Sequence, residues 1–455
     1  MQTTSEEYIN LTTIRLERAL STKQFWALVV FLFVVFAFVT PYEFDYSIRD
    51  NDVAEAMSAS QDGSPGRRLV MPLLGIFGIV VIFGNKLRRR LALNGALGVL
   101  FYCYLGFSFC SIAWAEEPLL ALRKLVVLFL FILGAVSIAA CFSMREILIY
   151  MAFTCGGAMI LALGAELYHG TFLQAKAYSI YQLSGIMHPN ALSCYISCYI
   201  LAIITLMCQN RYKYQVPYLI LVAIGFAFLY LAKSRTAFFC TVLVGFMIWL
   251  PSSTMSRRLT GFLGAAVLVC SLGLIFQDTF AVKMNSVVFM GRESEEGAST
   301  LTNRTPLWNE CMTYVEKKPW LGYGYDAFWT PYRIYLISQH QGWSVPHSHN
   351  GYIELLLSLG VVGLTLYLGT ILILIKRVLK FYFKTRDVVH LFAFGMIVWL
   401  SFEMMLEKVY MNPVFPSFVC NLVIARYAFV EDQEFKLVIQ GEEEDEIIGV
   451  LEATC

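Results

Sequence analysis

Long apolar runs separated by short polar segments dominate the pattern of this chain. Each run is close to the roughly 20 residues that a helix needs to cross a bilayer, or slightly shorter with flanking side chains that can reach the interface. The runs are Phe25–Thr40, Leu69–Gly84, Leu91–Ala113, Ala121–Cys141, Ile147–Leu167, Ala191–Cys208, Val216–Ala232, Thr236–Leu250, Leu259–Gln277, Tyr352–Ile375, Val388–Leu406 and Val414–Val430. They predict about 12 transmembrane helices in an all-α, polytopic helix bundle.

One polar segment, from Asp278 to Asn350, is much longer than the others and organises the predicted domains. We expect an N-terminal segment over 1–24, about nine spans over 25–277, a large loop with short helices over 278–350, about three further spans over 351–430, and an acidic tail over 431–455. A basic flank before the first run, and no clear cleavage site after it, favour an uncleaved span over a signal peptide.

The distribution of Lys and Arg in the short loops predicts the orientation of the bundle. Basic residues gather on one side of the predicted spans, at Arg15, Arg18, Lys23, Lys86, Arg88, Arg89, Arg90, Arg145, Arg211, Lys213, Arg257, Arg258, Lys376, Arg377, Lys380, Lys384 and Arg386. The other side has far fewer and carries acidic residues such as Glu43, Asp45 and Glu116. We therefore expect both termini in the cytoplasm and the large loop outside, on the periplasmic face in a Gram-negative cell.

Composition agrees with a membrane protein. Of the 455 residues, 58% are hydrophobic and 15% are charged, and the mean hydropathy is +0.62. Soluble domains carry about 25% charged residues. The net charge of +1 provides no field that would attract nucleic acid. Most of the 12 cysteines fall inside apolar runs and none form a CxxC pair, which argues against a disulfide framework or a cysteine metal site.

Two histidines, His347 and His349, stand one residue apart at the mouth of an apolar run and are followed by Asn350. Histidine can give or take a proton near neutral pH. In an extended segment both rings would point to one side and could bind zinc, but a zinc site needs a third ligand. The other histidines on the outer side are His340, His169 and His188. No acidic residue is suitably spaced, so we expect neither a metal nor a cofactor and favour a general base.

The segment Lys233–Thr236 lies at the outer start of a predicted span. Ser234 can cap that helix. A helix N-terminus that carries Arg235 beside Lys233 offers free N–H groups, a positive dipole end and a planar guanidinium, which together suit an anion. A basic anchor at the membrane interface explains the same residues equally well.

A second helix start is predicted inside the large loop, where Thr305 is followed by Pro306 and Pro319 ends the helix. One face of this helix is apolar and comprises Leu307, Trp308, Cys311, Met312 and Val315. The helix should therefore lie along the membrane or cap the bundle. Arg304 would stand at its positive end, a geometry that suits a phosphate; a solvated loop arginine is the alternative.

Two further features of the outer side leave their roles open. His188, Pro189 and Asn190 predict another helix start with His188 as the cap, which is either purely structural or lines a polar vestibule. An aromatic cluster follows the loop helix and comprises Trp320, Tyr323, Tyr325, Phe328, Trp329, Tyr332 and Tyr335. Aromatic residues there fit an interface belt or a surface that stacks on sugar rings.

Taken together, these motifs resemble the O-antigen ligase and exopolysaccharide polymerase superfamily of bacterial membrane glycosyltransferases. The ligases carry His, then Asn, Ser or Gln, nine residues and GxxG, which His349-Asn350 and Gly360–Gly363 match. Arg235 and Arg304 match the two arginines of the family. Further matches are Ser111–Trp114, Gly185–Asn190 and Pro319–Gly324, so the resemblance covers about Ser108 to Tyr367.

The resemblance implies transfer of a glycan from undecaprenyl pyrophosphate to an acceptor hydroxyl on the outer face of the bacterial inner membrane. The family implies inversion at the anomeric carbon, without a nucleotide sugar or a metal. Arg235 and Arg304 would hold the pyrophosphate, and His349 would take the proton of the hydroxyl. The expected substrate-binding residues are His347, Asn350, Lys233, His188 and Asn190.

The acceptor is left open by the motifs. The segments Trp320–Trp329 and His347–Tyr352 favour slightly the polymerase branch, in which the acceptor is another lipid-linked repeat unit; ligation to lipid A core is the alternative. A flippase or transporter is a second alternative, and would need charged or broken helices that meet near the bilayer midplane. Only Glu403, Glu407 and Lys408 point that way. Expected partners are the bilayer, the donor and the acceptor, with chain-length and export proteins as further candidates and no nucleic acid.

We predict that the whole Asp278–Asn350 loop faces outward, because of the asymmetry of Lys and Arg. An impermeant thiol reagent should then label Cys311, or a cysteine placed near Gly297, in intact spheroplasts. Labelling only after lysis would overturn the topology.

Overall fold

The computed structural model describes residues 38, 57, 65–83, 95–174, 181–210, 215–252, 294–410 and 413–430, and every regular element within these ranges is helical. The elements are α3 (Pro65–Phe83), α4 (Gly95–Cys110), η3 (Ser111–Trp114), α5 (Pro118–Cys141), α6 (Met144–Tyr168), α7 (Pro189–Gln209), α8 (Gln215–Ala232), α9 (Arg235–Ser252), α12 (Ser294–Lys317), α13 (Pro331–Gln341), α14 (Gly351–Thr385), α15 (Val388–Glu403), α16 (Phe415–Ala425) and η4 (Arg426–Val430). Several predicted parts lie outside the described residues: 1–24, Phe25–Thr40 except Phe38, Leu259–Gln277, 278–293 and 431–455.

Seven helices in the described ranges are long and apolar enough to cross a membrane. They are Gly95–Trp114, Pro118–Cys141, Met144–Tyr168, Pro189–Gln209, Gln215–Ala232, Arg235–Ser252 and Gly351–Thr385. Three shorter apolar helices, Val70–Phe83, Val388–Glu403 and Phe415–Val430, coincide with further predicted spans. The all-α, polytopic membrane fold is therefore confirmed, while a total of about 12 spans stays a prediction.

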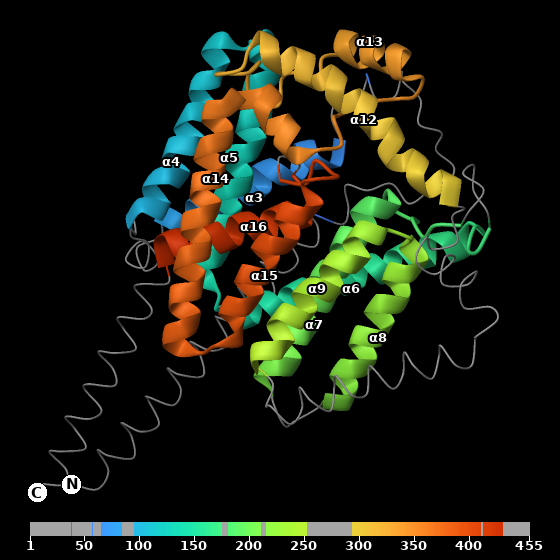
Figure 1. Ribbon diagram of the computed structural model, residues 1–455. Helices are drawn as coiled ribbons and strands as arrows, with labels where there is room; N and C mark the ends of the chain where they lie inside the picture. Colours follow the sequence, from blue (N-terminus) through green and yellow to red (C-terminus); the bar gives the residue numbers. More distant parts are fainter. Residues whose placement is uncertain are drawn as a thin grey trace, which may run out of the picture.

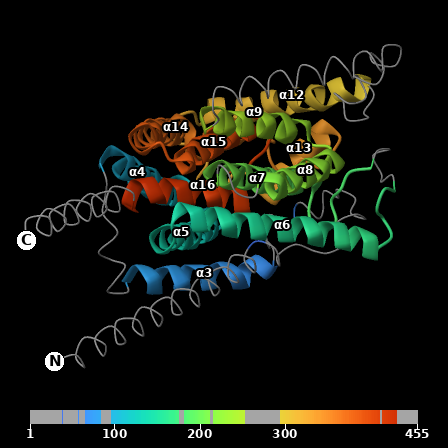
Figure 2. The ribbon, with the colours of Figure 1, turned by 90° about the horizontal axis from the view of Figure 1, so that it is seen from below.

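Helix α7 is surrounded by other helices. It packs against α6, α8 and α9, and nearly all of its residues are buried. A helix that is apolar on every side is expected in such a position. Helices α14 and α15 pack against each other, with α4 as the main other neighbour of α14 and α9 as that of α15. Helices α12 and α13 lie across one end of the bundle (Figure 1). Figure 2 shows α3 at the opposite edge from α12, where it packs against α5.

The starts of α7 and α14 meet just after the end of α15. Asn190 Nδ2, in the first turn of α7, donates to Glu407 Oε1 at 2.8 Å. Gly351 N, at the start of α14, donates to Met404 O at 2.7 Å. These bonds place two predicted site segments at the same end of the bundle.

The start of α9 belongs to this end as well. Leu183 N, in the segment that leads into α7, donates to Leu231 O at the end of α8 at 2.9 Å. Helix α9 begins only a few residues later, at Arg235. The third predicted segment therefore shares the end of the bundle that carries the other two.

Helix α14 is broken at Gly360, whose φ of 63° and ψ of −165° lie outside the helical region. Such a break leaves backbone groups on both sides without helical partners. The loop 319–324 supplies those partners through four backbone hydrogen bonds. They run from Tyr323 N to Leu357 O at 2.8 Å, Gly324 N to Ser358 O at 2.9 Å, Val361 N to Pro319 O at 2.8 Å and Val362 N to Trp320 O at 3.3 Å.

The short helix η3 holds the other side of the same loop. Tyr325 N donates to Ser111 Oγ at 2.9 Å, and Trp114 Nε1 donates to Leu321 O at 2.9 Å. Three motifs that the sequence presents separately, 111–114, 319–324 and 360–363, are therefore parts of one packing unit.

The predicted start of the loop helix is wrong. Helix α12 begins at Ser294 and runs through Pro306 to Lys317. A proline inside a helix removes one backbone hydrogen bond, and tertiary packing can compensate for that loss. The local signal of Thr305 followed by Pro306 gives no information about such packing. The predicted end before Pro319 and the role of the helix as a cap are confirmed (Figure 1). Its apolar face is buried at Leu307, Cys311 and Val315, whereas Met312 is exposed.

Most of the aromatic cluster is core, so a surface belt or a sugar-stacking platform is the wrong interpretation for those members. The buried ones are Tyr323, Tyr325, Phe328 and Trp329, and the exposed ones are Trp320, Tyr332 and Tyr335. Burial also affects the topology test, because Cys311 is fully buried and a reagent cannot reach its thiol from either side. The exposed Tyr332 on α13 is a suitable site for an introduced cysteine.

We predict that Gly360→Ala destabilises the protein by about 1–3 kcal/mol or more. The backbone conformation of Gly360 is essentially restricted to glycine. An added Cβ would also lie 2.3 Å from the backbone carbonyl carbon and oxygen of Trp320. The measurement is thermal unfolding of the purified protein in detergent.

Gly369→Ala, in the same helix, is the matched control. A Cβ at Gly369 would make an ordinary contact of 3.5 Å with Leu100 Cδ1, and alanine is the better helix former by about 1 kcal/mol. Equal stability of the two variants would contradict the importance of the break.

Candidate functional site

Side chains from two helices, α12 and α14, hold the turn that carries the two histidines. The buried carboxylate of Glu354, in the first turn of α14, accepts from Ser348 N at 2.6 Å and from Trp329 Nε1 at 2.8 Å. Trp308 Nε1, from α12, donates to Ser348 O at 3.0 Å. Both backbone polar groups of Ser348 are therefore paired with side chains, which defines the position of the turn.

His349 has a left-handed backbone conformation, with φ of 51°. For a residue other than glycine this costs on the order of 1–3 kcal/mol, and it persists where the surroundings determine the conformation. Asn350 provides part of that determination. Its side chain caps α14 by accepting from Tyr352 N and Ile353 N at 3.0 and 3.1 Å, and donates to Met405 O at 3.1 Å.

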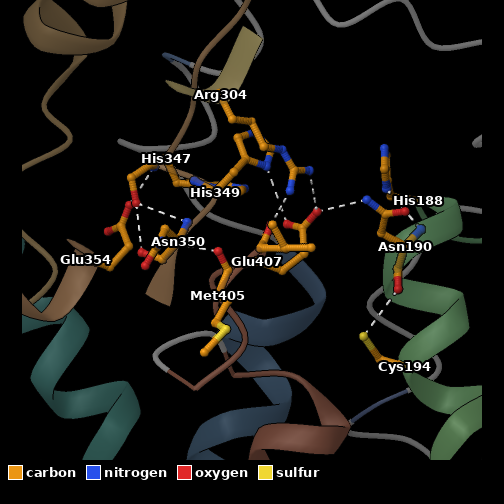
Figure 3. Close-up of polar contacts among 12 residues, drawn as sticks. His188, Asn190, Cys194, Arg304, His347, His349, Asn350, Glu354, Met405 and Glu407 are labelled. Carbon is orange, nitrogen blue, oxygen red and sulfur yellow. Dashed lines mark hydrogen bonds and ion pairs between the residues drawn. The ribbon is translucent and has the colours of Figure 1, made fainter. Parts of the chain in front are cut away.

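Glu407 connects the predicted segments (Figure 3). Its Oε2 lies 3.4 Å from His349 Nδ1. Its Oε1 accepts from Asn190 Nδ2 at 2.8 Å and from Arg304 Nη2 at 3.2 Å. Arg304 Nη1 donates to Leu406 O at 2.6 Å. One carboxylate thus pairs a histidine, an arginine and an amide from three separate parts of the chain.

The electrostatics of this cluster keep the carboxylate charged. Burial raises the pKa of Glu407, but the hydrogen bond with His349 and the nearby positive charge of Arg304 outweigh this effect, so that the net pKa lies below its ordinary 4.5. Burial, and then the proximity of His349, lowers the pKa of His347 well below its ordinary 6.5. At neutral pH, Glu407 is therefore an anion and His347 a neutral imidazole.

A buried ion network adjoins the cluster. Lys408 Nζ pairs with Asp326 Oδ1 and lies 3.2 Å from Glu354 Oε2, and Lys124 Nζ lies 3.3 Å from Asp326 Oδ2. Burial lowers the pKa of Lys408, but the two carboxylates raise it by more, so the ammonium stays charged. Burial raises the pKa of Asp326, and Lys124 and Lys408 reverse that effect to a net lowering. Because Glu354 also holds Ser348, this network supports the histidine turn.

The start of α7 has its own support. His188 caps the helix as predicted, and its side chain accepts from Asn190 N at 3.2 Å. Just before it, the buried carboxylate of Glu166 accepts from Ser184 N and Gly185 N at 2.8 and 3.2 Å. The approach of the chain to Asn190 is thereby defined, and Asn190 in turn reaches Glu407.

The two predicted anion sites differ in the structure. Arg304 lies inside α12 rather than at a helix N-terminus, because the helix starts earlier than its proline indicates; the expected dipole geometry is therefore wrong. Arg235 is the first residue of α9, as predicted. Lys233, just before it, has a left-handed backbone and lies over the ring of Tyr230 at 5.7 Å. Arg304 belongs to the cluster around Glu407, and Arg235 and Lys233 share its end of the bundle.

The argument that the histidine pair lacks a third metal ligand is also wrong. His347, His349 and Glu407 each offer a ligand atom, and these atoms lie within 4.8 Å of one another. Glu407 follows the histidines far along the chain, and only the fold brings it to them.

Sequence reasoning gave no role in this site to Glu407, Lys408 or Glu354. A signal for the first two was present, because ionisable residues are costly at the end of an apolar run and usually have a function or a partner there. For Glu354, inside the apolar stretch that follows the histidines, the same argument applies.

Residues 220–368 match the family described as O-Antigen ligase. The matched segment contains Arg235, Arg304, His347, His349 and Asn350, and Glu407 follows it. No curated protein matches the chain. The family match confirms the resemblance to the O-antigen ligase superfamily, and the apolar helices agree with a membrane protein.

We predict that Lys408→Met destabilises the protein by about 3–5 kcal/mol, because it leaves the carboxylate of Glu354 buried without a cation. Thermal unfolding in detergent measures the change. Lys318→Met is the matched control, since the Lys318–Glu116 pair is 2.8 Å long and both side chains are more than a third exposed. Such a pair contributes less than about 1 kcal/mol. Similar losses in both variants would argue against the buried network.

Proposed function

From the O-antigen ligase family that residues 220–368 match, we propose that this protein transfers a glycan from undecaprenyl pyrophosphate to an acceptor hydroxyl during synthesis of a surface polysaccharide. The observation that carries the proposal is the pairing of His349 with the ionised Glu407, at 3.4 Å, beside Arg304 on the same carboxylate. A base and a phosphate-binding cation at one end of a membrane bundle are the two groups this reaction needs.

In the proposed reaction His349 is the general base. A hydrogen bond from Nδ1 to Glu407 would assign the ring proton to Nδ1 and leave the lone pair on Nε2. His349 Nε2 is shielded from solvent and has no hydrogen-bond partner among the described residues. Nε2 would take the proton as the acceptor oxygen attacks the anomeric carbon, and Glu407 would stabilise the imidazolium that forms. The ring of Trp343 lies 5.5 Å from that of His349.

The leaving group is a pyrophosphate, whose developing charge needs fixed cations. Arg304 uses two donors for Leu406 O and Glu407, which leaves part of its five-donor fork for phosphate oxygens. Arg235, the first residue of α9, would add a guanidinium at the positive end of that helix. His347, Asn350, Lys233, His188 and Asn190 are proposed to position the substrates. Catalysis is proposed to proceed without a metal and with inversion, on the periplasmic face of the bacterial inner membrane.

For the acceptor we favour slightly another lipid-linked repeat unit, and hence polymerisation, over ligation to lipid A core. The exposed aromatic residues Trp320, Tyr332 and Tyr335 remain candidates for stacking on sugar rings. Transport is less well supported. Glu407 and Lys408, which suggested it, lie beside His349 and Asp326 and have partners in that site.

We predict that the base and the arginines fail differently when replaced. His349→Ala should lower turnover by about 10²–10⁴ while donor binding survives, because His349 acts on the acceptor. Arg235→Ala and Arg304→Ala should weaken donor binding as well as turnover, each by about 1.5–3 kcal/mol in binding. Lysine at either position should rescue only partly, because a point charge does not reproduce the planar fork.

The measurements are the donor affinity and the single-turnover rate of each purified, folded variant. The rate is measured once with a lipid-linked repeat unit as the acceptor and once with lipid A core. His340→Ala is the control, because His340 pairs with Glu310 on α12 and α13 outside the cluster. If His349→Ala abolishes donor binding while both arginine variants bind normally, the roles are reversed.

A further inference from the structure

The same cluster has the composition of a metal site. His347, His349 and Glu407 supply two imidazoles and one carboxylate, and one ligand atom from each lies within 4.8 Å of the others. Nitrogen and carboxylate ligands in this number form the protein part of many zinc sites that keep a fourth position open.

The spacing between His349 and Glu407 suits two ligands of one ion. The 3.4 Å from Nδ1 to Oε2 is long for a hydrogen bond, whose usual length is about 2.9 Å. Two ligands on a tetrahedral zinc, each bonded at about 2.0 Å, are about 3.3 Å apart. The present separation would therefore need almost no adjustment.

Glu407 is also held as a metal ligand usually is. Its two oxygens have different tasks: Oε1 accepts from Asn190 and Arg304, and Oε2 faces His349. In metal sites, hydrogen bonds to the oxygen that does not bind the metal orient a carboxylate ligand. The bonds to Oε1 would do this for Glu407. The charge of Arg304 opposes a cation, so we expect reversible rather than permanent occupation.

His347 completes the set. Its ring centroid lies 4.1 Å from that of His349, and its Nδ1 accepts a weak hydrogen bond of 3.2 Å from His349 N. A metal at His347 Nδ1 would replace this one bond. The turn that carries both rings is defined by Glu354 and Trp308 through Ser348, so the rings stay on the same side.

We propose that a zinc-type divalent cation binds His347, His349 and Glu407 and reversibly blocks transfer; the blocking part of this inference rests on the proposed function. Coordination at His349 Nδ1 displaces the proton from that atom. The neutral ring then carries its proton on Nε2, whose lone pair is no longer available as the base. The ion also occupies Oε2 of Glu407, which would otherwise stabilise the imidazolium.

The first test measures binding by itself. Full-length protein in detergent is freed of metal with EDTA, dialysed, and titrated with Zn²⁺ by calorimetry, and with Co²⁺ to record the absorption of the coordinated ion. Wild type should bind one ion at this site, and Glu407→Gln and His347→Ala should each lower the affinity at least about 10–100-fold. His340→Ala should leave it unchanged, although it also removes a histidine from a carboxylate, at 2.9 Å. Equal binding by wild type and both cluster variants would overturn the site.

The second test measures transfer with the lipid-linked donor and acceptor. Micromolar Zn²⁺ should inhibit the metal-free enzyme and EDTA should restore it. Loss of activity on chelation, with recovery on adding zinc, would overturn the blocking role and make the ion a cofactor. A third outcome is that zinc binds at the cluster but the protein shows no transfer activity even before zinc is added. That result would support the site and count against the proposed function. Transfer that zinc does not inhibit, in a protein that binds zinc at the cluster, would overturn the blocking role alone.

Discussion

The buried ammonium of Lys408 is the interaction on which the site depends most. A charge removed from water is costly unless it is paired and hydrogen-bonded. Lys408 finds Asp326 on one side and Glu354 on the other, and these come from the loop before α13 and the first turn of α14. Three segments that are distant in sequence are thus obliged to meet. Because Glu354 also accepts from Ser348 N, the same constraint positions the histidine turn.

The break in α14 is the backbone counterpart of this constraint. An uninterrupted helix would satisfy its own hydrogen bonds and present only side chains to its neighbours. At Gly360 the helix instead exposes carbonyl and N–H groups, and the loop 319–324 pairs with them. This brings Asp326, just beyond the loop, to the place where Lys408 can reach it. The motif Gly360–Gly363 therefore affects the site indirectly, because it determines the position of the loop 319–324.

Glu407 is the point at which charge, proton and phosphate chemistry would meet. A single ionised carboxylate faces His349 through one oxygen and Arg304 and Asn190 through the other. The arrangement has two consequences in our proposals. Glu407 would orient His349 as a base toward the acceptor. It would also be the third ligand of a divalent cation that blocks His349 as a base. Both follow from the same two oxygens, so replacing Glu407 alone affects both.

The sequence by itself determined the apolar helices that the structure describes and several of their ends, because these depend on neighbouring residues. Apolar runs must form helices in a bilayer, where the backbone has no water to bond to, and a cap such as His188 depends only on the next few residues. Tertiary structure decided the rest. Neither the partner of His349 nor the surroundings of Arg304 could be read from the pattern, because Glu407 lies far along the chain, and pairing between distant segments leaves no periodicity. Even the start of α12 depended on packing, since a proline signal that is correct locally was overridden by the contacts of the whole helix.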